Sequence, residues 1–320
     1  MIKFRFIFIL FWFLAHQAVG QIDQQKVDVF VANYAKNNGV LPAEVQSILE
    51  RAVYQPAIIE RIQRPSEDIS WKRYRGIFMT DERVAKGVTF WDNNLGTLQL
   101  VSDDTGVEVE YLVALLGVET YYGERKGGYK VLDALFTLAF GYPKRATFFT
   151  KELGEYLTLA KEQRLDVFEM EGSYAGAIGY CQFMPSSYRA YAKGFANVAS
   201  CDLVNNVDDA ISSAANYLKV HKWRHGEVVV MGTNKKDHAT VLAVQSLKPS
   251  YSVDHYLQLG YVAEDLNQKG LVTLIELDNE VSKEYWFGFN NFYVITRYNH
   301  SALYAMAVHQ LAQEIKKARG

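Results

Sequence analysis

The spacing of apolar residues changes once along the chain, and this change sets the fold class. The apolar residues recur at helical spacing from residue 21 to about 67, where Leu41-Pro42 marks the start of a second helix, and in stretches from about 105 to 225. Residues 70–95 are polar and aromatic, with unevenly spaced apolar positions. Residues 226–286 contain instead short runs rich in β-branched and aromatic residues, typical of strands, at 228–230, 271–277 and 285–289. A last helix is predicted over roughly residues 300–317. The sequence therefore predicts a mainly helical α+β protein with a small β subdomain near its C-terminus.

The first twenty residues have the pattern of a secretory signal peptide. Lys3 and Arg5 precede an apolar run at residues 6–14, and small residues follow at 18–20. The run is about half of the ~20 residues that a membrane-spanning helix needs. We therefore predict cleavage near Gly20 and export, with an uncleaved membrane anchor as the alternative. Because the junction carries no cysteine, lipidation is not expected there.

The charge of the chain argues against nucleic acid as a partner. Its 34 Lys and Arg residues nearly balance 36 Asp and Glu residues, which gives a net charge of −2. Proteins that bind nucleic acid non-specifically carry a basic surface instead. The composition also includes 21 tyrosines, whose rings offer an apolar face and a polar tip that suit sugars. A large aromatic core accounts for these tyrosines equally well.

One glutamate stands where helical spacing calls for an apolar residue. Residues 105–108 have the pattern of a capping box, so a helix is predicted from about residue 106 to Gly123. Within it Glu119 continues the apolar stripe of Leu112, Leu115 and Leu116. Burial and the negative end of the helix dipole would both raise the pKa of this carboxyl group, as a general acid requires. A core glutamate satisfied by an arginine or by backbone donors is the alternative.

Small and polar residues cluster in three later segments. Residues 172–179 are rich in glycine and alanine, which allows close approach of the backbone, and residues 182–188 and 297–301 supply amides and hydroxyls. The glycines have G-x-x-x-G-x-x-G spacing with no lysine after them, which disfavours nucleotide phosphate binding. The chain has no G-x-S-x-G motif, so a serine hydrolase is not expected.

The chain resembles the family B membrane-bound lytic murein transglycosylases in four segments, at residues 117–120, 142–146, 172–188 and 295–301. The resemblance runs from about residue 27 to the C-terminus and is weaker over 226–285. It implies a lysozyme-like core flanked by a helical domain and a small β domain. It also implies an enzyme that cleaves peptidoglycan between N-acetylmuramic acid and N-acetylglucosamine without using water, leaving a 1,6-anhydro ring.

The resemblance also implies how the chain is divided. We expect a signal peptide at 1–20, an N-terminal helical region at 21–104, a lysozyme-like catalytic core at 105–225, a small β subdomain at 226–290 and a C-terminal helix at 291–320 that completes the core. The expected partners are peptidoglycan glycan strands and cell-wall synthesis or remodelling proteins, and the expected state is a monomer in the periplasm without a cofactor. Two other functions stay open: a hydrolytic muramidase on the same fold, and a non-catalytic peptidoglycan-binding scaffold.

Individual residues receive roles from the same resemblance. Glu119 matches the family's single catalytic carboxylate, which acts first as acid and then as base, because the attacking hydroxyl belongs to the substrate itself. The positions that match the saccharide cleft are Ser173, Gln182, Tyr217, Tyr298, Asn299 and Tyr304. Core packing is the alternative for each tyrosine. Lys144 and Arg145 match a basic pair that would meet muramyl carboxylates; Lys144 departs from the family's residue type, and a solvated helix start is the alternative.

The loop after residue 188 departs from the family. Members of the family can carry a calcium-binding loop there, but Gly194 and Val198 stand where acidic ligands are expected, so we predict no metal site. The two cysteines, Cys181 and Cys201, would close a loop of about twenty residues in an oxidising compartment, worth roughly 3 kcal/mol of stability. We predict a disulfide between them, with two buried free thiols as the alternative.

Two further patterns are given structural roles. His221 and His225 have the i, i+4 spacing of zinc ligands, but no third ligand lies nearby in sequence, so a surface helix end is expected. Asp133 lies inside an apolar segment, and we expect it to accept buried hydrogen bonds rather than to act in catalysis.

Overall fold

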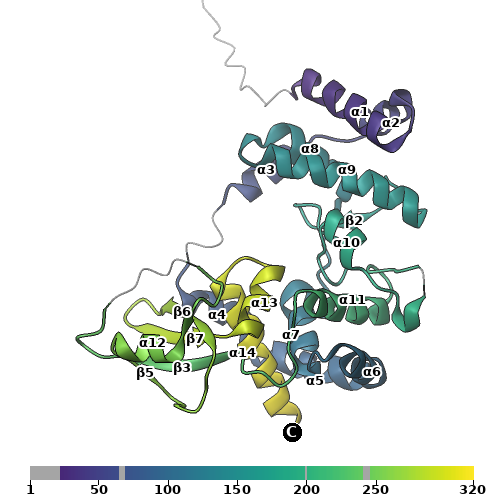
Figure 1. The fold of residues 1–320 in the computed structure, drawn as a ribbon. Helices are drawn as coiled ribbons and strands as arrows, with labels where there is room; N and C mark the ends of the chain where they lie inside the picture. Colours follow the sequence, from purple (N-terminus) through teal and green to yellow (C-terminus); the bar gives the residue numbers. More distant parts are fainter. Residues whose placement is uncertain (1–21, 65–68, 199, 241–245) are drawn as a thin grey trace, which may run out of the picture.

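A computed structural model describes residues 22–64, 69–198, 200–240 and 246–320, and the predicted signal segment at 1–20 lies outside them. Most of the described residues are helical, and a small sheet lies to one side of the helices (Figure 1). Buried apolar residues form one large cluster through the helices and one small cluster in the sheet. The predicted fold class, mainly helical α+β, is confirmed. Within these ranges no helix combines the length and hydrophobicity that crossing a bilayer requires.

The first body of helices, in the upper part of Figure 1, is built around α8. Helix α8 (Val131–Gly141) is buried over almost its whole length and packs on α9 (Ala146–Gln163) and α3 (Pro56–Ile62). The chain enters this body through α1 (Gln24–Asn38) and α2 (Pro42–Leu49), and α2 begins at Pro42 as predicted. The buried carboxylate of Asp133 accepts hydrogen bonds from the Val53 amide (2.8 Å) and the Gln55 side chain (3.1 Å). Its expected structural role is confirmed.

The second body of helices surrounds α14 (Ala302–Arg319), the predicted last helix. Helix α14 packs on α4 (Trp71–Phe78), α5 (Asp81–Asn93), α7 (Val109–Thr120) and α13 (Asn290–Tyr298). Helix α11 (Val207–Val220) packs on α7 and on α6 (Leu95–Thr105). The helices of residues 21–104 therefore divide: α1 to α3 accompany α8 and α9, whereas α4 to α6 accompany α7, α11 and α14 (Figure 1).

The predicted start of the helix that carries Glu119 is wrong. Thr105 belongs to α6, because its hydroxyl donates to the Val101 carbonyl (2.6 Å) and the left-handed Gly106 ends that helix. Glu108 cannot complete a capping box, since its carboxylate accepts hydrogen bonds from the Trp223 indole (2.8 Å) and the Gly226 amide (2.7 Å). Helix α7 therefore begins only at residue 109.

The predicted end of the same helix is also wrong. Gly123 was expected to end it, but α7 ends three residues earlier, at Thr120. Tyr121 already adopts the left-handed conformation, with a φ of 53°, and its amide bonds back to the last turn of the helix. The helix therefore ends at a tyrosine in the backbone conformation that glycine usually supplies.

The two bodies are joined by the segment between α9 and α11. Helix α10 (Pro185–Tyr191) contacts both of these helices. The buried carboxylate of Glu152 on α9 accepts hydrogen bonds from the amide (2.9 Å) and hydroxyl (2.6 Å) of Ser186. Arg189 pairs with Glu155 and Glu162 of α9. The short antiparallel strands β1 (Tyr129–Lys130) and β2 (Glu171–Gly172) lie near this junction. In the described ranges two short 3-10 helices complete the helical part: η1 (Pro143–Arg145) precedes α9, and η2 (Phe195–Asn197) follows α10.

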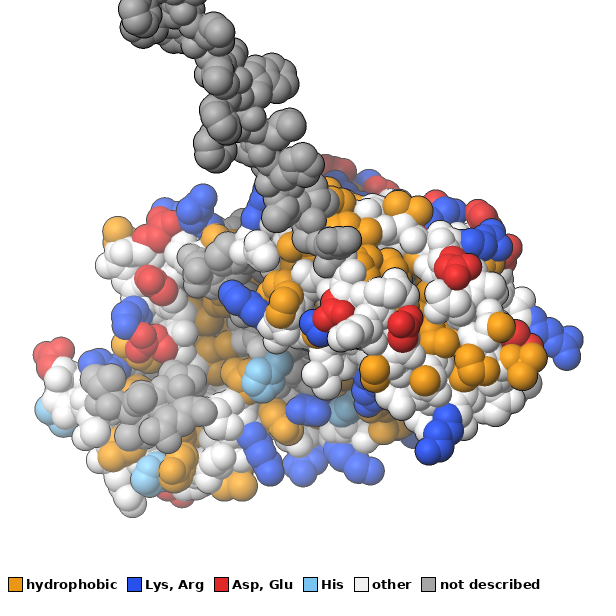
Figure 2. All heavy atoms as spheres, turned by 90° about the horizontal axis from the view of Figure 1, so that it is seen from above, with side chains coloured by type: hydrophobic (Ala, Val, Ile, Leu, Met, Phe, Trp, Pro, Cys, Tyr) orange, Lys and Arg blue, Asp and Glu red, His pale blue; other side chains and the backbone are white. Residues whose placement is uncertain are grey.

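The small sheet has five antiparallel strands in the order β4-β6-β7-β3-β5. The three predicted strands correspond to β3 (Val230–Lys235), β6 (Leu271–Asp278) and β7 (Lys283–Gly288), with shifted ends. The short strands β4 (Tyr251–Ser252) and β5 (Tyr261–Ala263) flank α12 (Val253–Gln258). Ile275 and Leu277 of β6 belong to the large helical cluster, so one face of the sheet packs on the helices. Seen from above, basic, acidic and apolar side chains are interspersed over the molecule (Figure 2).

Candidate active site

Glu119 lies in the last turn of α7, with its side chain partly buried between helices. The Tyr304 hydroxyl of α14 donates a hydrogen bond to its Oε1 atom. Burial raises the pKa of Glu119 to about 7, although the hydrogen bond from Tyr304 acts in the opposite direction. Among the described residues no other carboxylate contributes to this shift. The carboxyl group is therefore partly protonated at neutral pH and can both donate and accept a proton there.

The turn that carries Glu119 is held from α5 by Arg83, a residue that the sequence analysis missed. The Arg83 side chain is 6% exposed, and its Nη1 donates to the Gly117 carbonyl. In return the Tyr122 hydroxyl donates to the Arg83 carbonyl (2.8 Å). A Cβ atom on Gly117 would lie 2.6 Å from the Tyr122 ring, so any other residue there would displace that ring. No sequence pattern links Arg83 to Gly117, because helical periodicity reports on one helix at a time.

The chain leaves α7 through two successive tyrosines in the left-handed conformation. Tyr121 has a φ of 53° and Tyr122 a φ of 62°, a region that non-glycine residues seldom occupy. The Tyr121 ring faces the guanidinium groups of Arg83 (4.5 Å) and Arg125 (4.7 Å) and the ammonium group of Lys86 (4.5 Å). Such strain persists where the surroundings fix the conformation, and it concentrates at functional sites.

The glycine-rich run forms a tight loop held by its own polar groups. Ser173 Oγ accepts hydrogen bonds from the amides of Ala175 (3.2 Å) and Ala177 (3.0 Å). Gly179 has a φ of 67°, and a Cβ atom there would lie 2.1 Å from the Leu203 carbonyl oxygen. Gln182 Nε2 donates to the carbonyls of Lys126 (3.0 Å) and Gly179 (2.9 Å). The close approach predicted for this run is therefore a contact with the chain itself.

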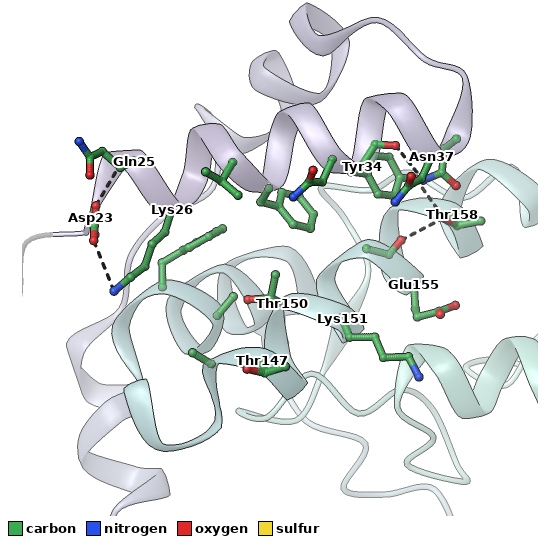
Figure 3. A pocket seen from close by; sticks show the side chains of 18 of the residues that line it. Asp23, Gln25, Lys26, Tyr34, Asn37, Thr147, Thr150, Lys151, Glu155 and Thr158 are labelled. Atoms are coloured by element: carbon green, nitrogen blue, oxygen red, sulfur yellow. Dashed lines mark hydrogen bonds and ion pairs between the residues drawn. The ribbon is translucent and has the colours of Figure 1, made fainter.

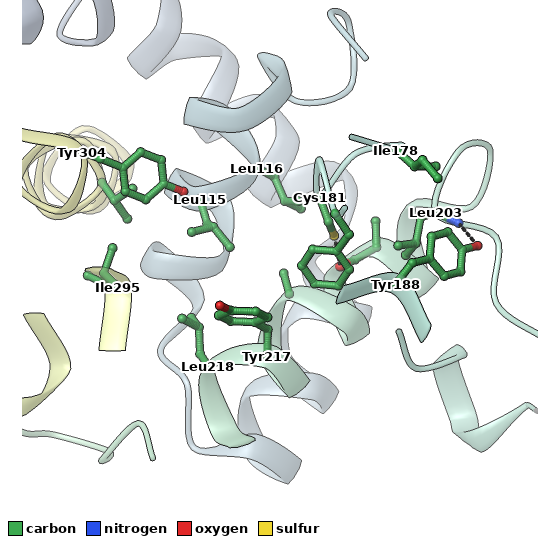
Figure 4. Close-up of a cluster of buried hydrophobic side chains, with 14 of the residues drawn as sticks. Leu115, Leu116, Ile178, Cys181, Tyr188, Leu203, Tyr217, Leu218, Ile295 and Tyr304 are labelled. Carbon is green, nitrogen blue, oxygen red and sulfur yellow. Dashed lines mark hydrogen bonds between the residues drawn. The ribbon is translucent and has the colours of Figure 1, made fainter. Parts of the chain in front are cut away.

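The three predicted cleft tyrosines come from three helices and meet beside α7. Tyr304 and Tyr217 extend from α14 and α11 toward the same region near Leu115 (Figure 4). The ring of Tyr298, at the end of α13, lies 4.7 Å from that of Tyr217 and 6.5 Å from that of Tyr304, between centroids. Tyr298 donates to the Cys181 carbonyl (2.6 Å), and Tyr217 donates to the Arg297 carbonyl. The structure thus brings all three tyrosines together with Glu119.

The remaining predicted site residues lie on the surface. Asn299 is exposed in the turn between α13 and α14. Lys144 and Arg145 are exposed in η1, and the Arg145 guanidinium lies 4.3 Å above the Phe148 ring. The described contacts do not join these three residues to Glu119 or to the tyrosines. Their assignment to substrate binding stays a prediction.

The predicted disulfide is wrong for this structure, in which both cysteines are free. The buried Cys181 thiol donates to the Ala210 carbonyl (3.2 Å), and the Cys201 sulfur lies 3.5 Å from Ser213 Oγ. Both thiols therefore contact α11 rather than each other. The loop is held instead by Asp209, whose carboxylate accepts from the amides of Phe195 and Asp202 (2.8 Å each).

The two histidines with zinc-like spacing lie just beyond the end of α11. The His221 ring stacks on Tyr217 at 4.2 Å, and its Nδ1 lies 2.8 Å from the Tyr217 carbonyl. His225 is exposed and lies 3.4 Å from Glu108. In the described ranges no group of three histidine, cysteine or carboxylate side chains is placed to hold a metal ion.

Comparison with known proteins gives one consistent result. A family model for the transglycosylase SLT domain matches residues 23–313. Membrane-bound lytic murein transglycosylase B of Escherichia coli (strain K12) is 36% identical over 301 residues, which cover 91% of this chain and 82% of that protein. The structure of catenated lytic transglycosylase SltB1 from Pseudomonas aeruginosa has a TM-score of 0.86 and 40% identity, covering 93% of this chain and 99% of that one.

A further structural relative is the Escherichia coli lytic transglycosylase Slt35 in complex with calcium. It has a TM-score of 0.83 and 36% identity, and the match covers 92% of this chain and 93% of that one. These neighbours have the lysozyme-like fold that the resemblance implied. The chain therefore belongs to the lytic murein transglycosylase family defined by the SLT domain.

Proposed function

We propose that this protein cleaves the β-1,4 bond between N-acetylmuramic acid and N-acetylglucosamine in peptidoglycan and forms 1,6-anhydro-N-acetylmuramic acid. One observation carries the proposal: Glu119 is a partly buried carboxyl group with a pKa of about 7 and no second carboxylate acting on it among the described residues. Most glycosidases that use water or a covalent intermediate work with a pair of carboxylates. A reaction whose nucleophile belongs to the substrate needs only one.

In the first step, neutral Glu119 donates its proton to the glycosidic oxygen as the bond from that oxygen to C1 of the muramyl residue breaks. The Tyr304 hydroxyl already donates to Oε1, so we assign the proton transfer to Oε2. The raised pKa supplies the protonated form at neutral pH. The leaving N-acetylglucosamine end keeps this proton on its O4 hydroxyl.

In the second step, the Glu119 carboxylate accepts the proton of the muramyl C6 hydroxyl while O6 bonds to C1. The 1,6-anhydro ring closes, Glu119 returns to its protonated form, and no water enters the products. The Tyr304 hydroxyl stabilises the carboxylate between the two steps, because hydrogen bonding to the charged form favours it.

The predicted cleft residues then have separate tasks. The hydroxyls of Tyr217 and Tyr298 donate to backbone carbonyls. Tyr217 is buried and its ring packs on His221 and Tyr298, so it supports the cleft from below, whereas the ring of the partly buried Tyr298 is offered to sugar faces. Ser173 and Gln182 shape the loop at the cleft. The exposed amide of Asn299 and the cations of Lys144 and Arg145 suit acetamido groups and stem-peptide carboxylates, respectively.

The place of action follows from the substrate. Peptidoglycan lies outside the cytoplasmic membrane, and residues 1–20 have the pattern of an export signal without a cysteine at the junction. We therefore assign the protein to the periplasm without a lipid anchor. A monomeric state and cell-wall synthesis or remodelling proteins as partners are what the family resemblance implies.

The test is digestion of purified sacculi, followed by mass spectrometry of the soluble muropeptides. The proposal predicts anhydro-muropeptides from the wild-type protein and none from Glu119→Gln. Products heavier by one water would support the muramidase. Binding to sacculi without any product from the wild-type protein would support the scaffold.

A further inference from the structure

A groove of about 780 Å³ runs between α1 and α9, in the first body of helices (Figure 3). Its lining residues do not include Glu119 or the three cleft tyrosines. Phe30 and Phe140, in edge contact at 6.1 Å, are among its apolar lining residues. The volume lies within the range of roughly 300–1,000 Å³ that small-molecule sites occupy.

The groove is open because both helices present small or polar residues to it. Facing helices usually interlock apolar side chains across about 8–10 Å. Here α9 contributes Thr147, Thr150 and Gly154, and α1 contributes Asn33 and Asn37. A Cβ atom on Gly154 would approach only the rings of Tyr34 and Phe30, at 3.5 Å or more. Neither crowding nor backbone conformation requires glycine there, so its effect is to keep the groove wide.

Several polar groups that line the groove have no partner among the residues that the structure describes. The ion pairs Asp23–Lys26 (3.3 Å) and Glu155–Arg189 neutralise four of its charged side chains. Lys151 makes no such pair within the described ranges, and its exposed side chain lies on the α9 side of the groove (Figure 3). In the same ranges the side chains of Asn33, Asn37, Thr147 and Thr150 make no hydrogen bond. The described part of the groove therefore offers one unpaired cation, two amides and two hydroxyls beside an apolar surface.

We propose that this groove is a second peptidoglycan-binding site, which holds a stretch of glycan and stem peptide away from the reacting bond. Sugar faces would lie on the apolar surface, hydroxyl and acetamido groups would meet the asparagines and threonines, and a stem-peptide carboxylate would pair with Lys151. The inference rests on the proposed function. A second weak contact keeps the enzyme on the insoluble polymer and so raises the effective concentration of glycan at the active site.

The binding test uses Glu119→Gln protein, which leaves sacculi intact, in a pelleting assay. Lys151→Glu reverses the unpaired charge, and Thr150→Trp fills the groove. Lys161→Glu is the matched control, because Lys161 is exposed on the same helix but does not line the groove. We expect each groove variant to weaken sacculus binding several-fold and the control to leave it unchanged. Equal binding by all variants, or an equal loss in the control, would overturn the proposal.

A second measurement places the same substitutions in protein that retains Glu119. On a short soluble glycan, which cannot reach both sites, Lys151→Glu and Thr150→Trp should match the wild-type rate, and only digestion of sacculi should slow. Equal losses on both substrates would assign the effect to folding or to the active site and overturn the proposal. Failure of the proposed function is distinct, since the wild-type protein would then release no anhydro product from either substrate.

Discussion

The Tyr304 hydroxyl donates its hydrogen bond to Oε1 of Glu119, and so connects α14 to the last turn of α7. Burial favours the neutral acid, whereas this bond favours the carboxylate. The two opposing effects hold the pKa of Glu119 near 7. A group that must donate a proton and then accept one benefits from this balance, because neither form is strongly disfavoured.

Replacing Glu119 by glutamine should abolish activity and preserve the fold. The amide keeps the shape but transfers no proton, and general acid–base catalysis contributes about 10²–10⁴-fold. Because the folded-state pKa of Glu119 is raised from 4.5 to about 7, the folded protein loses stability as pH rises from about 4.5 to about 7, and the loss is complete above that range. The variant should therefore be at least as stable as wild type at pH 8, by thermal melting.

The matched control is Glu110→Gln, a buried glutamate on the same helix that pairs with Lys316 (2.7 Å). It should retain most of the activity. Glu119→Gln activity within a few-fold of wild type would contradict the assignment of the catalytic acid.

Replacing Tyr304 by phenylalanine should shift the pH profile. The first step needs protonated Glu119, so the rate falls as pH rises through the pKa of this group. Among the described residues, the Tyr304 hydrogen bond is the one contact that lowers this pKa. Its loss should move the alkaline limb of kcat/KM to higher pH while the maximal rate decreases. Tyr298→Phe is the control, since the Tyr298 hydroxyl donates its hydrogen bond to the Cys181 carbonyl and not to Glu119. An identical shift of the alkaline limb in both variants would refute the role of Tyr304.

Replacing Arg83 by methionine should separate catalysis from stability. Arg83 is buried, and its Nε has no hydrogen-bond partner among the described residues. Methionine removes a desolvated charge at the cost of one hydrogen bond, and these two effects on stability offset each other in part. The Gly117 carbonyl loses its side-chain donor, so Glu119 should be positioned less well. We expect kcat to fall about tenfold or more, with little change in KM and melting temperature.

Arg75→Met on α4, where the side chain is exposed and bonds to Gln310, is the control for Arg83. A loss of stability in Arg83→Met that accounts for its loss of rate would make Arg83 a structural residue only.

Replacing Asp209 by alanine should destabilise the loop that follows α10. Its buried carboxylate accepts from the amides of Phe195 and Asp202, and hydrogen bonds to charged groups are worth about 1.5–3 kcal/mol each. Asp208→Ala, which loses a hydrogen bond from Thr97 (2.6 Å), should lower the free energy of unfolding by less.

Calcium should leave the melting temperature of the wild-type protein unchanged, and a calcium-dependent rise would contradict the predicted absence of a metal site.

The sequence predicted features that are local and periodic. The position of Glu119 followed from the spacing of Leu112, Leu115 and Leu116, and the structure places its carboxyl group partly buried. The capping-box prediction failed because Glu108 bonds to residues 223 and 226, which lie more than a hundred positions away in sequence. Spacing along one segment cannot show such competition for a side chain.

Contacts between distant segments could not be predicted either, because spacing along one segment does not show which other segment packs on it. Arg83 meets Gly117 only because α5 packs on α7. The disulfide was predicted from loop length and compartment, whereas the direction of each thiol depends on how α11 packs. The three tyrosines were assigned to the cleft through the family resemblance alone, because their own pattern does not distinguish a cleft from a core, and that assignment stays a prediction.

The central claim is that one carboxylate performs both steps without water, and digestion of sacculi in H₂¹⁸O tests it most directly. The account predicts anhydro-muropeptides that carry no ¹⁸O at C1 of the muramyl residue. Muramyl products that are heavier by one labelled water, formed by the wild-type protein and absent with Glu119→Gln, would contradict it.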